Sequence, residues 1–215
     1  MKVLLIRHGQ TDSNASGTLQ GHLPTALNSC GLEQAERLVA RFAASSIRFD
    51  RFITSDLRRA VETAAPIERV LGMAADRDAA WRERSFGALE GRQIGDTEIW
   101  RAADGTLDPP EAEPLAALQS RVELALETLA AAVVPSHTVA VVTHGGVIRT
   151  ALHLFASGRL TLADAHETVS VQPILNASIL HLAVERRGED VIWRVERMND
   201  VDHLASDMLT VAAPG

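Results

Sequence analysis

The residues best suited to chemistry begin with an arginine and a histidine near the N-terminus. Arg7 and His8 directly follow the apolar run Val3–Ile6, which predicts a buried strand with two polar side chains at its carboxyl end. Ligands of open α/β sheets bind at that edge. A neutral imidazole can act as a nucleophile, and the planar guanidinium fork matches phosphate oxygens. The pair suggests a nucleophile beside an anion clamp, although this motif taken alone favours a structural histidine, so the functional interpretation depends on the rest of the chain.

A second histidine repeats this design. The run Thr138–Thr143 leads into His144, and Gly145 and Gly146 then precede a helix predicted over Val147–Ala156. The free backbone N–H groups and the dipole at such a helix N-terminus favour an oxyanion beside His144. Two histidines at the carboxyl ends of two buried strands favour a functional role more strongly than either one alone.

A further cation is predicted at the same edge of the sheet. Ser55 is expected to start a helix whose first turn contains Arg58 and Arg59. Parallel strands would place that turn on the edge where His8 lies. Positive charge is unfavourable at a helix N-terminus, so the placement favours a function for Arg59, with a solvated surface pair as the alternative.

Two glutamates are candidates for proton transfer. Glu83 and Glu90 flank a turn-forming segment amid apolar residues. Partial burial would let one of them hold a proton near neutral pH, as a general acid requires. A solvated loop carboxylate is the alternative, and the local pattern does not choose between the two glutamates.

The elements that must position these residues alternate between strands and helices, as in an α/β fold. Helix faces expected to be buried include Leu32 and Val70. Besides the two histidine strands and the helices named above, the pattern predicts a strand over Phe49–Thr54, helices after Asn28 and Pro114, and an antiparallel pair over Ser178–Val184 and Val191–Val195.

Two irregular segments are predicted near the site. The stretch Asp12–Thr25 is expected to be a long loop over the end of the first strand, from which the Asn14 amide could reach the same anion as His8. The polar region at about 92–114 predicts a connector or a lid. No linker, repeat or shift in composition divides the chain, so residues 1–215 are expected to form one domain.

Composition narrows the class of protein. The chain has 21 basic and 28 acidic residues and a net charge of −7, which argues against nonspecific binding to nucleic acid or to an acidic membrane surface. The apolar runs are too short for a membrane span, and Arg7 interrupts the first run too early for a signal-peptide core, so a cytoplasmic protein is expected. The single cysteine, Cys30, excludes an intramolecular disulfide.

Four blocks of the sequence together resemble the histidine phosphatase superfamily, in the branch that contains cofactor-dependent phosphoglycerate mutase and its phosphatase relatives. Each block is a weak match by itself, but all four occur in the order and at separations compatible with that family. The resemblance covers nearly the whole chain. The blocks are Leu5–Thr11, Ser55–Ala60, Glu83–Gly91 and Val142–Arg149.

The resemblance implies a three-layer α/β/α sandwich with a mostly parallel central sheet, to which the predicted hairpin adds an antiparallel edge. It also implies that His8 attacks phosphorus and that Glu83 protonates the leaving oxygen. The residues that would hold the phosphoryl group are Arg7, Arg59 and His144, and the implied substrate contacts are Asn14, Gln20, Gly21 and Gly145. No metal and no cofactor are expected, because these side chains neutralise the phosphate.

Departures from the family pattern bear on the activity. The interval from Glu83 to His144 is short and lacks the lysine and paired arginines with which mutases of this family hold a substrate carboxylate, which favours a phosphatase. Glu83-Arg84 followed by Gly87-Ala88-Leu89 is somewhat mutase-like, so a phosphoglycerate mutase is the alternative. A noncatalytic phospho-ligand binding module is the second alternative. The expected partner is a small phosphorylated metabolite, and a homodimer is left open.

Overall fold

The central sheet of the computed structural model has six strands in the order β3-β2-β4-β1-β5-β6. The structure describes residues 1–45, 47–100, 107–163 and 173–209. β1, β4, β2 and β3 are parallel, whereas β5 runs antiparallel to β1 and β6 antiparallel to β5. The predicted mostly parallel sheet with an antiparallel edge is therefore confirmed. The strands are β1 Lys2–Arg7, β2 Arg51–Thr54, β3 Asp76–Arg77, β4 Thr138–Thr143, β5 Ile179–Arg187 and β6 Asp190–Asp200.

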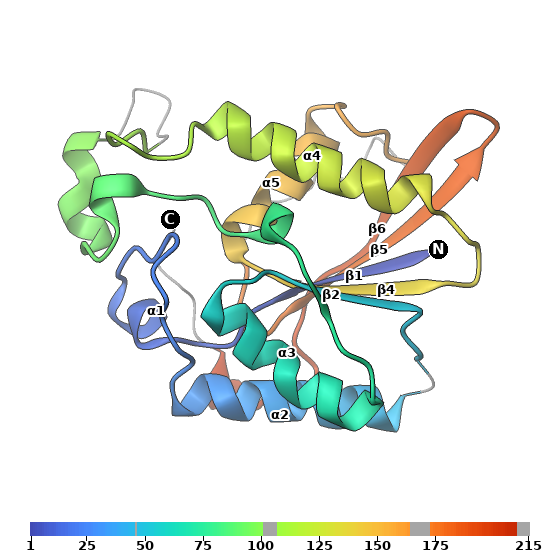
Figure 1. Ribbon diagram of the computed structural model, residues 1–215, viewed down its shortest axis with the longest axis horizontal. Coiled ribbons are helices and arrows are strands. Elements are labelled where there is room, and N and C mark those ends of the chain that lie inside the picture. The colour runs from blue at the N-terminus through green and yellow to red at the C-terminus, as the bar shows by residue number, and fades with distance from the viewer. Residues whose placement is uncertain (46, 101–106, 164–172, 210–215) are drawn as a thin grey trace.

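Helices cover both faces of the sheet, as the three-layer prediction requires. Figure 1 shows α2 and α3 on one face and α4 and α5 on the other. The α-helices are α1 Asp12–Ser16, α2 Ser29–Ala44, α3 Arg58–Leu71, α4 Leu115–Ala131 and α5 Gly145–Ala156, and the described 3-10 turns are η1 Ala79–Trp81, η2 Gly87–Leu89, η3 Ile94–Trp100 and η4 Ser206–Met208. Among the described residues, no helix combines the length and the apolar character needed to cross a membrane.

The first strand is apolar on both of its faces because both are covered. Val3 and Leu5 belong to the core beneath α4 and α5, whereas Leu4 and Ile6 belong to the core against α2 and α3. Each of these four side chains is at most 2% exposed. The strand can therefore present polar side chains only where it ends, at Arg7 and beyond.

The structure corrects the predicted loop after the first strand and two predictions about α3. The loop expected over Asp12–Thr25 contains α1, because the Thr11 side chain and Asn14 cap each other across the first turn of that helix. α3 begins at Arg58 rather than directly after Ser55. Val70, which was expected on the buried face, is 49% exposed. It lies in the last turn of α3, where no residue is fully buried.

The second misplaced apolar residue is Leu32, which is 52% exposed. The buried stripe of α2 includes the side chain of Gln34, whose amide accepts a hydrogen bond from the Gln10 N–H at 2.8 Å. A polar side chain thus occupies a core position that the hydrophobic pattern did not predict, and the stripe it belongs to leaves Leu32 in solvent.

The antiparallel pair is present and longer than predicted. β5 and β6 continue through the charged residues between the two predicted strands, and the chain reverses at Gly188, whose φ of 65° suits glycine. Of the lid predicted at about 92–114, residues 101–106 lie outside the described residues. The flanking parts contain η3 and Leu107, and Leu107 is 4% exposed in a small cluster with Leu19 and Phe86.

Candidate active site

Strand register places the two predicted histidines side by side. Arg7 on β1 pairs with Thr143 on β4, so His8 and His144 occupy the next position of each strand. Their ring centroids are 5.1 Å apart, and the side chains are 2% and 0% exposed. The pair therefore lies at the carboxyl edge of the parallel sheet, as the two histidine motifs predicted.

Hydrogen bonds fix which nitrogen of His8 carries the proton. Nδ1 lies 2.7 Å from the Gly9 carbonyl oxygen, which can only accept, so Nδ1 is the donor. Nε2 accepts a hydrogen bond from Nε of Arg59 at 3.2 Å. The lone pair of His8 is therefore on Nε2, beside a guanidinium, and Nε2 is the candidate nucleophilic atom.

The two candidate arginines are buried and are held mainly by backbone carbonyls. Arg59 is 1% exposed and donates to the carbonyls of Gly21 at 2.8 Å and Leu23 at 3.3 Å. Arg7 is 5% exposed and donates from one terminal nitrogen to the Ile174 carbonyl, while its Nε is buried without a partner. In the described part of the chain neither forms a salt bridge, so their charge is available to an anion.

Burial and mutual repulsion set the charge states of the site. Burial lowers the pKa of Arg7 and that of Arg59 to about 10, so both remain cationic at neutral pH. Burial, followed by the charges of Arg59 and Arg7, holds the pKa of His8 well below 6.5. The pKa of His144 is likewise well below 6.5, chiefly because the ring is buried. Both imidazoles are therefore neutral at neutral pH, which is the state that a nucleophilic histidine requires.

The carboxyl group of Glu83 is fixed at the N-terminus of α5. Its two oxygens accept hydrogen bonds from the N–H groups of Arg84 and Gly146, each at 3.0 Å. A Cβ atom at position 146 would lie 2.0 Å from Oε1 of Glu83, so any other residue there would displace the carboxyl group from this position. One of the α5 N–H groups predicted to face an oxyanion therefore holds the carboxyl group instead.

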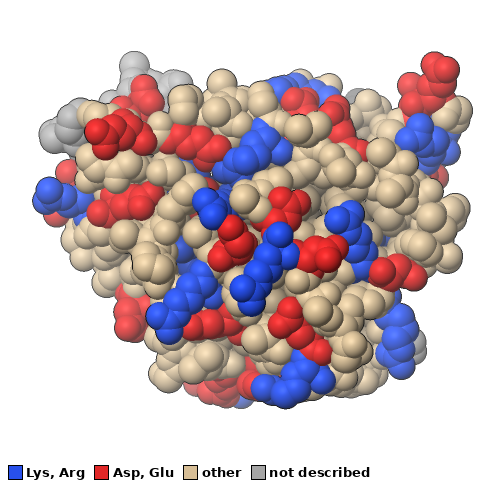
Figure 2. Space-filling view, in the orientation of Figure 1, with Lys and Arg blue, Asp and Glu red and all other residues tan. Residues whose placement is uncertain are grey.

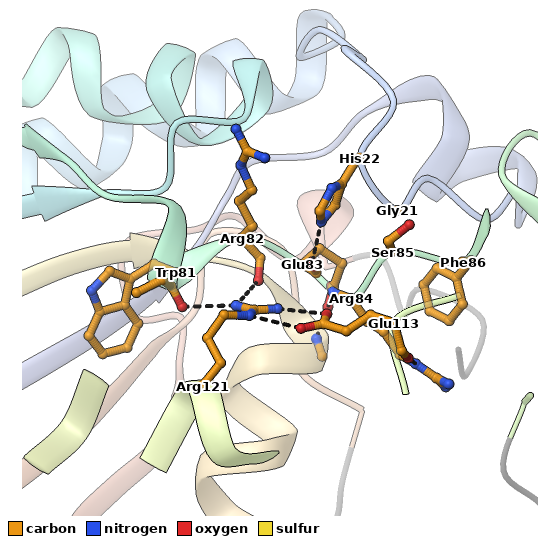
Figure 3. A network of polar contacts seen from close by, with 12 residues as sticks. Gly21, His22, Trp81, Arg82, Glu83, Arg84, Ser85, Phe86, Glu113 and Arg121 are labelled. Carbon is orange, nitrogen blue, oxygen red and sulfur yellow. Dashed lines mark hydrogen bonds and ion pairs between the residues drawn. The ribbon is translucent and has the colours of Figure 1, made fainter. Parts of the chain in front are cut away.

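The structure also distinguishes the two glutamates that the local pattern left open. Oε1 of Glu90 accepts from the N–H groups of His22 and Phe86, each at 3.0 Å, and from the Ser85 hydroxyl at 3.1 Å. Glu90 thus organises the turn, whereas Glu83 lines the cavity that contains His8. Figure 3 shows the segment around Glu83 and the side chains that contact it.

A cavity brings together most of the predicted site residues, including the four predicted substrate contacts. Oδ1 of Asn14 accepts hydrogen bonds from the Thr11 N–H and from Asn176, each at 3.1 Å. Oε1 of Gln20 accepts from the hydroxyls of Thr11 at 3.0 Å and Thr25 at 2.6 Å. The cavity is lined by Arg7, His8, Asn14, Thr18, Leu19, Gln20, Gly21, Arg59, Glu83, Phe86, Ile94, Gly145 and Arg149.

His144 is the predicted site residue that does not line this cavity. It lies behind His8, with Nε2 2.8 Å from the hydroxyl of Ser55 and Nδ1 buried without a partner. The Ser55 oxygen also accepts from the Leu57 N–H at 3.3 Å, which leaves the hydroxyl proton free to point at His144. The ring is therefore fixed in place from the start of the α3 segment.

Two residues at the site were missed by the sequence analysis. Arg149 lines the cavity from one turn beyond Gly145, a spacing that a predicted helix could have revealed. Asn176 is 2% exposed and donates to the His8 carbonyl at 3.1 Å. Nothing near Asn176 in the sequence predicts this contact with His8, because 168 positions separate the two residues.

The donors around the cavity suit an anion rather than a metal ion. They are guanidinium, amide and backbone groups, and in the described ranges no group of three or more His, Cys, Asp and Glu side chains is arranged to hold a metal. A phosphate or a similar oxyanion matches this donor set, because arginine forks bind such groups in a bidentate manner.

Comparison with known proteins agrees with this geometry. The family model of the histidine phosphatase superfamily (branch 1) matches residues 3–201. The chain belongs to this superfamily. It is 31% identical to a phosphoglycerate mutase-like protein of Arabidopsis thaliana, covering 94% of this chain and 86% of that one. It is 28% identical to a broad-specificity phosphatase of Saccharomyces cerevisiae, covering 99% and 91% of the two chains.

Solved structures of the superfamily share the fold. A mycobacterial glucosyl-3-phosphoglycerate phosphatase in complex with VO3 superposes with a TM-score of 0.74 at 24% identity, covering 92% of this chain and 98% of that one. A phosphoserine phosphatase variant of Entamoeba histolytica superposes with a TM-score of 0.73 at 21% identity, covering 95% and 99%. The α/β sandwich of this histidine phosphatase chain is therefore the architecture of the superfamily.

Proposed function

We propose that this protein is a phosphomonoester hydrolase that works through a phosphohistidine on Nε2 of His8. The observation that carries the proposal is the state of that atom. Nε2 bears a lone pair, the ring is neutral, and the nitrogen adjoins the buried guanidinium of Arg59 in a cavity that Arg7 and Glu83 also line. A neutral nucleophile next to uncompensated cations is what transfer of a dianionic phosphoryl group requires.

The chemistry proceeds in two steps. Arg7 and Arg59 hold the phosphoryl oxygens while Nε2 of His8 forms a bond to phosphorus, the P–O bond to the alcohol breaks, and Glu83 gives the leaving oxygen its proton. Water then gives a proton to Glu83 and attacks phosphorus, the P–N bond to Nε2 of His8 breaks, and phosphate leaves with the lone pair restored to Nε2. Losing one preorganised donor of this kind costs about 3 to 4 kcal/mol, or roughly a hundred- to thousandfold in rate.

His144 is assigned to the same step as a neutral donor. If the Ser55 hydroxyl donates to Nε2 at 2.8 Å, the ring proton of His144 lies on Nδ1, which has no other partner. The ring centroid lies 5.1 Å from that of His8, close enough for a phosphoryl group on His8 to meet this donor. His144 would then stabilise the phosphohistidine without adding positive charge to the free site.

The substrate is proposed to be a small phosphorylated metabolite handled in the cytoplasm. The cations at the site are drawn into one cavity, and on the face shown in Figure 2 basic and acidic side chains are interspersed rather than gathered into a basic surface. Ile94, which belongs to the region at about 92–114 that the sequence predicts as a connector or a lid, lines the cavity. Relatives named as phosphatases support hydrolysis.

A phosphoglycerate mutase is the second candidate. Two relatives, which are 30% and 31% identical to this chain, are named as probable phosphoglycerate mutases. The discriminating experiment follows phosphorus by NMR with 3-phosphoglycerate, a trace of 2,3-bisphosphoglycerate, and His8→Ala as control. Release of free phosphate that disappears in His8→Ala supports the hydrolase and eliminates a purely binding role. Formation of 2-phosphoglycerate without net phosphate release would make the protein a mutase.

A further inference from the structure

The chain around Glu83 has no helix or strand of its own. Residues 82–86 connect the 3-10 turns η1 and η2, so their backbone carbonyls lack the regular partners of a ladder. The carbonyls of Ala80 and Arg82 both accept hydrogen bonds from one terminal nitrogen of Arg121, at 2.8 and 2.9 Å. A residue on α4 therefore holds the backbone immediately before Glu83.

Arg121 is itself fixed by the carboxylate of Glu113, whose backbone contacts the residues that follow Glu83. Nε and the second terminal nitrogen of Arg121 donate to the two oxygens of Glu113 at 2.9 and 2.7 Å (Figure 3). The Glu113 N–H donates to the Ser85 carbonyl at 3.0 Å, and the Glu113 carbonyl accepts from Nε of Arg84 at 2.7 Å. One bidentate pair thus anchors the chain both before and after Glu83.

The platform beneath this pair is rigid. Arg121 lies between Leu118 and Val122 on α4, and those two side chains are 3% and 0% exposed in the core. Arg121 and Glu113 are 23% and 18% exposed, and neither lines the phosphoryl cavity. Any effect of this pair on chemistry must therefore pass through the segment that it holds.

We propose that Arg121 and Glu113 are positioning residues that hold the Glu83 carboxyl group in line with the leaving oxygen. The inference rests on the proposed role of Glu83 as proton donor. Glu83 is fixed by Gly146 at its carboxyl group and by His22 at its carbonyl, with Nε2 of His22 donating at 2.8 Å. Loss of Arg121 frees the two carbonyls upstream, so the carboxyl group would leave its place at the start of α5.

The first test measures the position of the Glu83 carboxyl group and does not depend on enzymatic activity. The Gly146 amide, which donates to Oε2 of Glu83, is followed in a 15N–1H correlation spectrum of wild type, Arg121→Met and Glu83→Ala. Arg121→Met is expected to move this resonance toward its position in Glu83→Ala and to speed its exchange with water. A Gly146 resonance that stays in place in a folded Arg121→Met protein would overturn the proposal.

The second test reads the consequence for catalysis. Arg121→Met is expected to lower kcat/KM for glycerol 2-phosphate about tenfold more than for nitrophenyl phosphate, because only the alkyl ester needs a proton on its leaving oxygen. Glu113→Gln keeps the backbone contacts of residue 113 and is expected to show the same bias at smaller size. Equal losses for both esters in both variants, in a protein whose Glu83→Gln variant does show the bias, would count against a positioning role.

The matched control is Arg159→Met. Arg159 also forms a two-nitrogen pair with a carboxylate on α4, that of Glu123, and the pair does not contact the Glu83 segment. It is expected to leave the Gly146 resonance and the ratio of the two esters unchanged. If Glu83→Gln slows both esters equally while Arg121→Met still moves Gly146, the positioning inference stands and the assignment of Glu83 as the acid fails.

Discussion

Two sets of buried charges in this protein are built in opposite ways. At the end of the sheet, Arg41 donates two hydrogen bonds to Asp200, at 2.8 and 2.5 Å, and the Asp200 side chain is fully buried. In the cavity, Arg7 and Arg59 are more deeply buried than Arg41, yet neither has a carboxylate partner in the described part of the chain. The first set is neutralised within the fold, and the second leaves its charge for a ligand.

The comparison indicates which buried charges are available to bind a ligand. A buried charge costs free energy unless it is paired, so an unpaired guanidinium is tolerated only when carbonyls hold it in place or an anion completes it. Arg59 has the carbonyls of Gly21 and Leu23, and His8 as a further acceptor. The cavity thus holds preorganised cationic groups that an anion could complete, whereas the Arg41–Asp200 pair serves the fold.

The largest effect is expected on removing an unpaired cation. Arg59→Met should lower kcat/KM for a phosphomonoester roughly a hundred- to thousandfold, because it removes a donor to the charge of the transition state. Its free energy of unfolding should change by about 1 kcal/mol or less, since relief of a buried charge offsets the lost hydrogen bonds. Steady-state kinetics measure the change in kcat/KM, and urea unfolding measures the change in the free energy of unfolding. A large loss of stability with unchanged kinetics would show that Arg59 serves the fold and would contradict the comparison.

The paired cation should show the opposite pattern. Arg41→Met leaves the Asp200 carboxylate buried with less compensation, so we expect it to lower the free energy of unfolding by about 2 to 3 kcal/mol. Activity of the folded protein should stay within about twofold, because a change distant from the site that leaves the fold intact removes no transition-state contact. Urea unfolding with Arg37→Met as an exposed-pair control checks this, and equal stabilities of the two variants would contradict it.

Acid should affect the two regions in separate pH windows. The pKa of His8 lies well below 6.5 in the folded state, so its contribution is intact above 6.5 and stability falls as pH drops below that value, by at most about 1.4 kcal/mol per pH unit. Arg41 and its neighbours lower the pKa of Asp200 from 3.8 to about 2, so that contribution is lost only between these values. In plots of the free energy of unfolding against pH, His8→Ala should lose less stability than wild type as the pH falls below 6.5. Arg41→Met should lose less than wild type as the pH falls from 3.8 to about 2.

The smallest effect is expected from chelation. Because the proposed mechanism assigns the electrostatic stabilisation to Arg7, Arg59 and His144, phosphate release should be unchanged within error after treatment with EDTA. Activity that falls on chelation and returns with a divalent ion would show that the cations of the cavity do not suffice.

The sequence was informative where local pattern and position coincide. His8 and His144 each follow a buried strand, and parallel pairing of those strands was enough to bring them together. Arg59 could be placed from the strand and helix that flank it. Glu83 needed more, because the local pattern left two glutamates open and only the family resemblance selected Glu83. In the structure, contacts from distant segments, such as Gly146 to Glu83 and His22 to Glu90, separate the two.

Other features could not be read from the sequence because they depend on long-range contacts. Asn176 precedes β5 and reaches the His8 carbonyl at the end of the neighbouring β1, and the Arg121 side chain reaches the segment before Glu83 from another layer. The hydrogen bond that holds His144 comes from Ser55, 89 positions away. No local periodicity encodes such contacts, since each joins residues whose own surroundings in the sequence are ordinary.

The central claim is that His8 carries the phosphoryl group, and rapid quenching with a radiolabelled phosphomonoester tests it most directly. Wild type should acquire label that is stable to alkali and labile to acid, up to one phosphate per chain, before free phosphate appears. The label should be absent from His8→Ala and should map to the peptide that contains His8. Phosphate release by wild type with no such label, or label that persists in His8→Ala, would contradict the account.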